Sequence, residues 1–236
     1  MKIHPPIDPD RHGLHDLLTR RGLTAGWLNT DDGDPYGTRN ITRHALGDAI
    51  RAVPRHYRSA VPEHQLVGAW ADTLAEAART EHVQAGTAMP SVQHGRSLLL
   101  LGITGVGKTY EAYGAIRHLA ASGVRASWTV TTAADLYAAL RPRAGIDAEA
   151  EFAHYRDARL LLVDDLGAAK SSEFTEEINF RLVNHRYEHE RPTLFTSNVL
   201  PAELSARVGD RVASRLAEMC DRVVLTGSDR RRETQS

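Results

Sequence analysis

The segment GITGVGKT, at residues 102–109, constrains the fold of this chain more than any other feature of its sequence. It fits the pattern G-x-x-x-x-G-K-[ST]. The apolar run SLLLL at 97–101 precedes it and predicts a buried strand, and a helix is predicted after it at about 108–121. A strand, a glycine-rich turn and a helix in this order form a phosphate-binding loop. The segment therefore predicts an α/β fold with a site for ATP.

Each part of this loop has an expected role. Gly102, Gly105 and Gly107 let backbone N–H groups curl around the β-phosphate, Lys108 reaches the β- and γ-oxygens, and the Thr109 hydroxyl ligates Mg²⁺. The helix N-terminus adds a partial positive charge. A glycine-rich turn without a ligand is the alternative, and the strand–helix context disfavours it. The predicted nucleotide-binding residues are Gly102, Ile103, Thr104, Gly105, Val106, Gly107, Lys108, Thr109, Tyr110 and Asp164.

A second motif, LLLVDDLG at 160–167, is an apolar strand that ends in two acids. Asp164 is predicted to hold Mg²⁺ through a water, and Asp165 is the candidate base for the attacking water. Adjacent carboxylates point to opposite sides of an extended chain, so they can act separately. Asn198, at the end of the next apolar strand, is predicted to orient that water. An acidic turn and a strand-closing asparagine are the plainer alternatives for these two segments.

A helix predicted within 207–220 carries Arg211 and Arg215 four residues apart, beside an apolar stripe of Val212, Leu216 and Met219. One hypothesis is that an arginine reaches the γ-phosphate of a neighbouring subunit. The other is a solvated or salt-bridged helix face, and the spacing alone favours this second reading.

Strands and helices alternate from about residue 56 onward, which predicts a parallel sheet buried on both faces. The strands are expected at about 97–101, 125–130, 160–165, 193–198 and 222–226. Residues 1–55 differ, with helical patterns at about 13–21 and 42–52 around a turn-rich patch at 29–40. We predict a small helical N-terminal module over 1–55 that binds a partner, and an ATPase domain over 56–236.

Composition limits which other kinds of site, partner and location the protein can have. The net charge of −1 neither requires nor excludes a nucleic-acid partner. The single cysteine, Cys220, excludes an intrachain disulfide and a four-cysteine zinc site. No apolar run is long enough to span a bilayer, and the N-terminus lacks a secretory signal, so we expect a cytoplasmic protein. The only lysines are Lys2, Lys108 and Lys170, which makes a chance lysine in the glycine-rich loop less plausible.

Together these motifs resemble the DnaC/DnaI helicase-loader family of AAA+ ATPases, with the IstB transposition ATPases closely related. The resemblance spans about residues 54–232. The blocks that carry it are PRHYRSA at 54–60, GITGVGKT at 102–109, LLLVDDLG at 160–167, VNHRYEHERPTLFTSNVLPAEL at 183–204, GDRVASRL at 209–216 and VVLTGSDRR at 223–231.

The resemblance implies an AAA+ core with sheet order 5-1-4-3-2 and no C-terminal lid. It implies that Asn198 is sensor 1, that Arg215 is a trans-acting arginine finger, and that Arg231 is the sensor-2 arginine. The catalytic set is then Lys108, Asp165, Asn198, Arg215 and Arg231. The interrupted helical region at 132–156 is placed like the family's insertion that contacts single-stranded DNA.

The activity implied by the resemblance is ATP hydrolysis by a loader that assembles with ATP into a homo-oligomer. Its partners would be a DnaB-type hexameric replicative helicase and single-stranded DNA. An IstB-like transposition helper that binds duplex DNA is the alternative. A P-loop kinase would need a lid and an acceptor pocket, and the chain leaves little room for a lid after residue 226.

Overall fold

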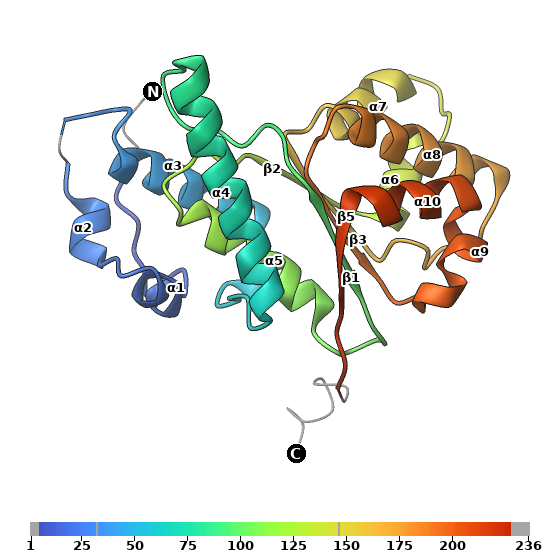
Figure 1. Ribbon diagram of the computed structural model, residues 1–236, viewed down its shortest axis with the longest axis horizontal. Coiled ribbons are helices and arrows are strands. Elements are labelled where there is room, and N and C mark those ends of the chain that lie inside the picture. The colour runs from blue at the N-terminus through green and yellow to red at the C-terminus, as the bar shows by residue number, and fades with distance from the viewer. Residues whose placement is uncertain (1–4, 32, 146, 228–236) are drawn as a thin grey trace. The chain divides into compact units, whose positions relative to one another are not determined.

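The computed structural model describes residues 5–31, 33–145 and 147–227, and these form two compact units (Figure 1). The first unit combines the chain up to His94 with Tyr110–Trp128, and the second combines Gly95–Thr109 with the chain from Thr129 onward. The boundary predicted near residue 55 stays a prediction.

The second unit is built on a five-stranded parallel sheet with the strand order β2-β3-β4-β1-β5. The predicted order 5-1-4-3-2 is this order read from the other edge, so the prediction is confirmed. Parallel pairing is registered for β1 with β4, β1 with β5 and β3 with β4. The strands are β1 (Ser97–Leu101), β2 (Trp128–Thr132), β3 (Leu160–Asp164), β4 (Thr193–Ser197) and β5 (Cys220–Val224).

Alternate strand residues face the main apolar core of this unit. Leu99, Val163 and Phe195 belong to it, and every residue of β1, β3 and β4 is buried, as a parallel sheet requires. Helices α6 to α10 gather on one side of the strands (Figure 1). Their bounds are α6 (Ala133–Leu140), α7 (Ala148–Arg156), α8 (Glu173–Glu188), α9 (Leu204–Val208) and α10 (Asp210–Met219), with the short 3-10 turn η2 (Pro201–Glu203) before α9.

The apolar stripe predicted on the helix within 207–220 is present. Val212, Leu216 and Met219 of α10 are buried in the core. On α8, Ile178 and Leu182 are buried there. Helix α8 begins at a capping box, in which the side chains of Ser172 and Thr175 each accept a hydrogen bond from the other residue's backbone N–H. The apolar stripe and the cap are local signals, set by residues three or four positions apart.

One charged side chain, that of Arg186 in α8, is fully buried in this unit. Its guanidinium donates to four backbone carbonyl oxygens and one hydroxyl, at distances of 2.6 to 3.2 Å. Burial lowers the pKa of Arg186 to about 9, so the group still carries its charge at neutral pH. The acceptors are the oxygens of Tyr155, Arg156, Ala158, Pro192 and Thr193.

We expect Arg186→Met to lower the free energy of unfolding by about 3 kcal/mol or more, because several buried carbonyl groups lose their donor. Urea unfolding would measure this loss. Arg181→Met is the matched control: Arg181 lies on the same helix, is partly exposed, and pairs with Glu149 at the surface. Its loss should cost about 1 kcal/mol or less. Equal losses in the two variants would contradict this account of the Arg186 cage.

The first unit is helical. It contains α1 (His15–Arg20), α2 (Ala25–Asn29), α3 (Thr38–Ala52), the 3-10 turn η1 (Arg55–Tyr57), α4 (Gln65–Ala85), and α5 (Lys108–Ala120) from Tyr110 onward. The predicted helical N-terminal part is therefore confirmed. Helix α2 was not predicted; it is short, and the Thr24 side chain caps it. Among the described residues, no helix is both long and apolar enough to cross a membrane.

Helix α5 holds the segments around it in place. A Cβ atom on Gly114 would lie 2.6 Å from the Val61 carbonyl carbon, so only glycine allows this close approach. The buried Glu111 carboxylate accepts hydrogen bonds from the backbone N–H groups of Glu63 and His64. Burial raises the pKa of Glu111, and these two bonds oppose that rise. The segment at 61–64 is thereby fixed on α5.

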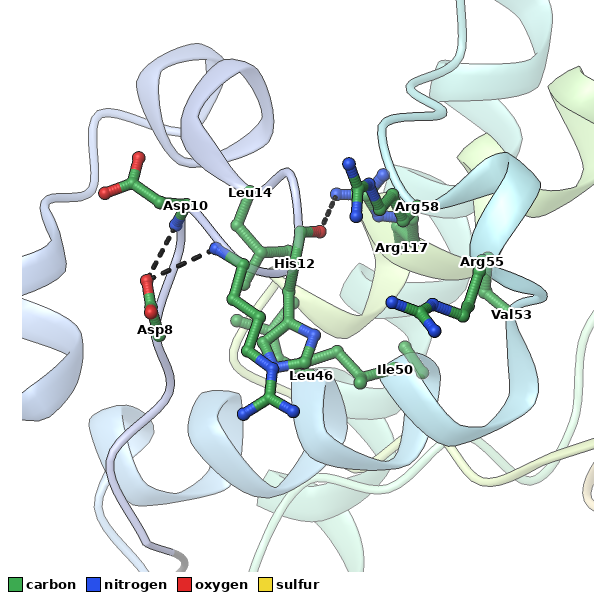
Figure 2. A pocket seen from close by; sticks show the side chains of 12 residues that line it. Asp8, Asp10, His12, Leu14, Leu46, Ile50, Val53, Arg55, Arg58 and Arg117 are labelled. Atoms are coloured by element: carbon green, nitrogen blue, oxygen red, sulfur yellow. Dashed lines mark hydrogen bonds between the residues drawn. The ribbon is translucent and has the colours of Figure 1, made fainter.

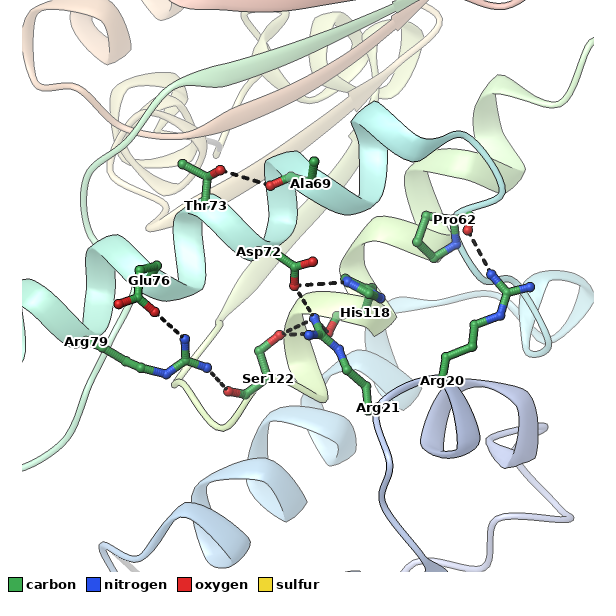
Figure 3. Close-up of polar contacts among 10 residues, drawn as sticks. All are labelled: Arg20, Arg21, Pro62, Ala69, Asp72, Thr73, Glu76, Arg79, His118 and Ser122. Atoms are coloured by element: carbon green, nitrogen blue, oxygen red, sulfur yellow. Dashed lines mark hydrogen bonds and ion pairs between the residues drawn. The ribbon is translucent and has the colours of Figure 1, made fainter.

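A polar network joins α1, α4 and the end of α5 (Figure 3). Arg21 pairs with Asp72 at 2.7 Å and donates to the Ser122 hydroxyl at 2.6 Å. Arg79 donates to the Ser122 carbonyl oxygen at 2.6 Å. Burial lowers the pKa of His118, which lies 3.1 Å from Asp72. These contacts connect segments from opposite ends of the first unit's sequence.

The second predicted strand begins later than expected, at Trp128 instead of about residue 125. The backbone at Arg125 pairs instead with the segment before β1: its N–H donates to the Pro90 oxygen, and its carbonyl accepts from Val92. Strand β5 is shifted the other way and begins at Cys220. The pairing of Arg125 accounts for the first shift, and the register of β5 on β1, in which Cys220 pairs with Ser97, accounts for the second.

Candidate nucleotide-binding and hydrolysis site

The loop between β1 and α5 depends on its glycines. Gly102, Gly105 and Gly107 have φ angles of 152°, 84° and 102°, a region that side-chain-bearing residues rarely adopt. A Cβ atom on Gly102 would also lie 2.5 Å from the Leu225 carbonyl oxygen. Within the loop, Val106 is buried, whereas Ile103 and Thr104 are exposed. The backbone thus takes a path that only the predicted glycine pattern permits.

Lys108 is the first residue of α5, and only 5% of it is exposed. Its ammonium group donates to the Gly102 and Ile103 carbonyl oxygens at 2.9 Å each. It also donates to the Asn198 side-chain oxygen at 2.5 Å. The lysine therefore lies over its own loop and reaches the end of β4. These contacts place the cation within the curl of the loop, where phosphate oxygens would bind.

Asp164 closes β3 and is 9% exposed. The Thr109 hydroxyl lies 3.3 Å from both of its carboxylate oxygens, and the Thr196 hydroxyl donates to one of them. Burial raises the pKa of Asp164 and the nearby charge of Asp165 adds to the rise, while the Thr196 hydrogen bond opposes it. A bound cation would favour the ionised carboxylate. Hydroxyl and carboxylate oxygens are the donors that Mg²⁺ prefers, so Thr109 and Asp164 fit this ion.

Asp165 leaves the strand in a left-handed conformation, with φ of 58°. Its N–H donates to the Thr196 hydroxyl at 2.9 Å, and its carboxylate accepts from the Asn198 amide at 2.8 Å. The two acids thus have different neighbours: Thr109 for Asp164 and Asn198 for Asp165. The two carboxylates were expected to act separately because adjacent side chains point to opposite sides of an extended chain. That reason is wrong, because the chain turns at Asp165 and is not extended there.

Thr196 is the residue that the sequence reasoning missed. Its hydroxyl donates to Asp164 and accepts from the Asp165 N–H, so one β4 side chain holds both acids. It is fully buried. One signal in the sequence could have identified Thr196. It lies in TSN, two residues before Asn198, on the strand β4 that pairs with β3, where Asp164 lies.

Two further predicted site residues, Tyr110 and Arg231, lie outside the residues of the second unit that the structure describes. Tyr110 is half-buried and belongs to the first unit. Arg231 and the predicted absence of a lid fall in residues 228–236, outside the described part of the chain. Their roles stay predictions.

Arg215 lies on α10 in a surface cluster. Its guanidinium carbon is 4.3 Å from the centre of the Tyr187 ring, and one of its nitrogens is 3.6 Å from Glu218. The Tyr187 hydroxyl in turn donates to Glu218 at 2.7 Å. Arg211, one turn earlier, lies 5.7 Å from the Phe180 ring. In the single chain both arginines therefore rest on aromatic rings of α8, and Arg215 also has the surface ion pair that its spacing favoured.

Taken together, the second unit brings a buried lysine, a hydroxyl, two carboxylates and an amide to one edge of the parallel sheet. A cation in a glycine-rich loop can meet phosphate oxygens, and a hydroxyl beside a carboxylate can hold a divalent metal. The second carboxylate, hydrogen-bonded to an amide, can accept a proton from water. This is a set of groups suited to cleaving a phosphoanhydride.

Comparisons with known proteins agree with this geometry. Residues 42–236 match the family model described as IstB-like ATP binding protein. None of the curated proteins compared with the chain matches its sequence significantly.

Three solved structures illustrate the fold, and at identities of 21–22% they establish the fold alone. The DnaC helicase loader is 22% identical with a TM-score of 0.55, over 73% of this chain and 100% of that one. DnaI is 22% identical with a TM-score of 0.56, over 75% and 94% of the two chains. AMPPCP-bound DnaA from Aquifex aeolicus is 21% identical with a TM-score of 0.52, over 83% and 51%. Since the family match covers most of its length, the chain belongs to the family of IstB-like ATP-binding proteins.

Proposed function

We propose that this protein binds Mg-ATP, hydrolyses it, and acts in the cytoplasm as a loader of a replicative helicase. The observation that carries the ATPase part is the contact of Lys108 with Asn198, whose amide also bonds Asp165. The lysine that would meet the phosphates and the acid that would activate water are thus linked through a single side chain.

ATP and Mg²⁺, when bound, would supply the γ-phosphoryl group and the metal charge that stabilises its transfer. Lys108 would exchange its loop carbonyls for phosphate oxygens, and Thr109 with Asp164 would hold the metal. Asp165 would accept the proton of the attacking water, and Asn198 would orient that water. Thr196 keeps both carboxylates in place. An arginine from a neighbouring subunit, Arg215, would complete the charge stabilisation.

We expect Asp165→Asn to separate ATP binding from hydrolysis. Asparagine tolerates the left-handed conformation at this position and can still accept the Asn198 hydrogen bond, so the turn should persist. The base is lost, and turnover should fall by roughly 100-fold or more, with ATP affinity close to that of the wild type. Phosphate release and nucleotide titration would measure the two quantities.

Asp210→Asn is the matched control for this variant, because it removes an acidic charge at the start of α10 without touching the cluster. It should leave turnover unchanged. A parallel loss of affinity and turnover in Asp165→Asn would mean that Asp165 acts on the metal instead of the water.

The loader role draws on the sequence resemblance and on the names of the similar structures, a helicase loader and DnaI. The proposed partners are a DnaB-type hexameric helicase, captured through the N-terminal module at 1–55, and single-stranded DNA. The chain at 141–145, between α6 and α7, is exposed and carries Arg141 and Arg143. These residues are candidates for contacts with DNA phosphates. Assembly into a homo-oligomer on ATP binding is part of the same proposal.

A second candidate is a transposition helper that binds duplex DNA, and the family match to IstB-like proteins favours it. Two measurements with ATP present separate the candidates: capture of the hexameric replicative helicase of the same organism, and relative affinity for single-stranded and duplex DNA. Helicase capture with a preference for single strands supports the loader. Duplex preference without capture replaces it with the helper.

A further inference from the structure

The first unit contains a pocket of about 800 Å³ that shares no residue with the glycine-rich loop (Figure 2). The N-terminal segment, α3, the η1 turn and α5 contribute to it. Its lining consists of an apolar group and a charged group: Leu14, Leu46, Ala49, Ile50 and Val53, and Asp8, Asp10, Arg11, His12, Arg55, Arg58 and Arg117. Its volume lies in the range of about 300–1,000 Å³ that small-molecule sites occupy.

The apolar residues form the inner wall. Leu14, Leu46 and Ala49 are at most 2% exposed, and Val53 is also buried, whereas Ile50 is half-buried. These side chains belong to α3, to the residue that follows it, Val53, and to the residue just before α1, Leu14. The wall offers contact to a hydrocarbon or aromatic group, and nothing in it can hydrogen-bond to a polar one.

Four arginines surround this wall. Arg11, Arg55 and Arg58 are exposed, and the Arg55 guanidinium extends toward the middle of the pocket (Figure 2). Arg117 is 3% exposed and donates to the carbonyl oxygens of His12 and Gly13. Burial lowers the pKa of Arg117 to about 10, which leaves it charged at neutral pH.

The two acids of the pocket are engaged with their own turn. Asp8 accepts hydrogen bonds from the backbone N–H groups of Asp10 and Arg11, and Asp10 pairs with His15. In the described part of the chain, none of the four pocket arginines forms an ion pair with a carboxylate. The pocket therefore combines an apolar wall with an excess of positive charge.

We infer that this pocket binds a small amphiphilic anion, with an apolar body against α3 and a carboxylate, sulfonate or phosphate head at Arg55 and Arg58. The apolar wall would contribute nothing to the binding of a nucleic-acid backbone, whose groups are phosphates and sugars. A neutral apolar ligand would leave the arginines without a counter-charge. Guanidinium groups bind planar and tetrahedral oxyanions through two parallel hydrogen bonds, which suits such a head.

A pair of fluorescent probes tests this inference on the full chain. Anilinonaphthalene sulfonate has an aromatic body and one negative charge, and N-phenylnaphthylamine is the same body without the sulfonate. We expect one site per chain for the sulfonate, with affinity about tenfold or more above that of the neutral probe, because a charge-assisted hydrogen bond is worth that much.

Substitutions then assign the site. Arg55→Gln and Arg58→Gln should each lower the affinity for the sulfonate probe by about tenfold and leave the affinity for the neutral probe unchanged. Arg51→Gln is the matched control, because Arg51 is an exposed arginine on α3 that pairs with Asp48 and does not line the pocket. Ala49→Leu, which adds volume to the wall, should lower the affinity for both probes.

Two results would overturn the inference. One is sulfonate binding that persists unchanged in the double variant Arg55→Gln/Arg58→Gln. The other is competition by ATP, in which rising ATP concentration displaces all of the bound sulfonate. That result would place the probe in the nucleotide site. Failure of the proposed ATPase activity would leave both probe experiments interpretable, because they require no hydrolysis.

Discussion

Replacement of Lys108 by alanine is expected to abolish ATP hydrolysis and to leave the fold intact. Removal of a cation aimed at phosphate oxygens should lower turnover by about 10²–10³ or more, the loss seen when one preorganised charge-stabilising group is deleted. In the free protein, Lys108 bonds two carbonyl oxygens of its own loop and the Asn198 side chain. The variant should therefore also loosen the loop, while the strand before it remains buried.

Three measurements define this result: phosphate release, ATP affinity by titration, and the thermal unfolding midpoint. Lys170→Ala is the matched control, since it removes an exposed lysine outside the site and should behave like the wild type. Wild-type turnover in Lys108→Ala would refute the assignment of the loop. A collapse of the unfolding midpoint would instead show that the lysine supports the fold.

Replacement of Arg215 by alanine is expected to preserve ATP binding and to lower hydrolysis by about 10³–10⁵, as known arginine fingers do. The apolar residues Val212 and Leu216 hold α10 in the core, so Arg215 projects from a fixed helix face. Its contacts with Tyr187 and Glu218 hold it on that surface. We expect a neighbouring subunit to receive it at the γ-phosphate.

Mixing two inactive variants tests the action in trans. Arg215→Ala retains its nucleotide pocket, and Lys108→Ala retains its finger. At a mixed interface the intact finger meets the intact pocket, so activity should return in the mixture. If mixed oligomers form and the mixture stays inactive, the surface ion pair with Glu218 is the whole role of Arg215.

Arg211→Ala controls for the loss of a positive charge from the same helix face. Arg211 rests on Phe180 as Arg215 rests on Tyr187, and Arg215 has in addition the ion pair with Glu218. A much smaller loss in Arg211→Ala is expected. Equal losses would point to the charge of the whole face, and not to one finger.

The nucleotide loop and the strand order could be predicted because their signals are local or follow from topology. The glycines of the loop have conformations that other residues rarely adopt, so their spacing identifies the turn. Short apolar runs bounded by turn residues identified β1, β3 and β4, and the family resemblance supplied their order. The apolar stripe of α10 follows from a helical period of 3.6 residues.

Boundaries and supporting contacts could not be predicted in this way. The start of β2 depends on the pairing of Arg125 with residues 90–92, and the turn at Asp165 depends on the Thr196 hydroxyl. The cage of carbonyls around Arg186 is assembled from the end of α7 and the start of β4. Each of these contacts joins segments that are separated in the sequence. Such contacts produce no repeating pattern of apolar and polar residues from which they could be predicted.

The sequence by itself determined where phosphates could bind and which strands could be buried, since glycine conformations and hydrophobic period act over a few residues. Only the tertiary structure decided that Asn198 meets both Lys108 and Asp165, and that four arginines surround one apolar wall in the first unit. The physical reason is that a parallel sheet aligns the ends of strands that are distant in sequence. β4 lies between β1 and β3, so its last residues contact the loop that follows one neighbour and the acids that end the other.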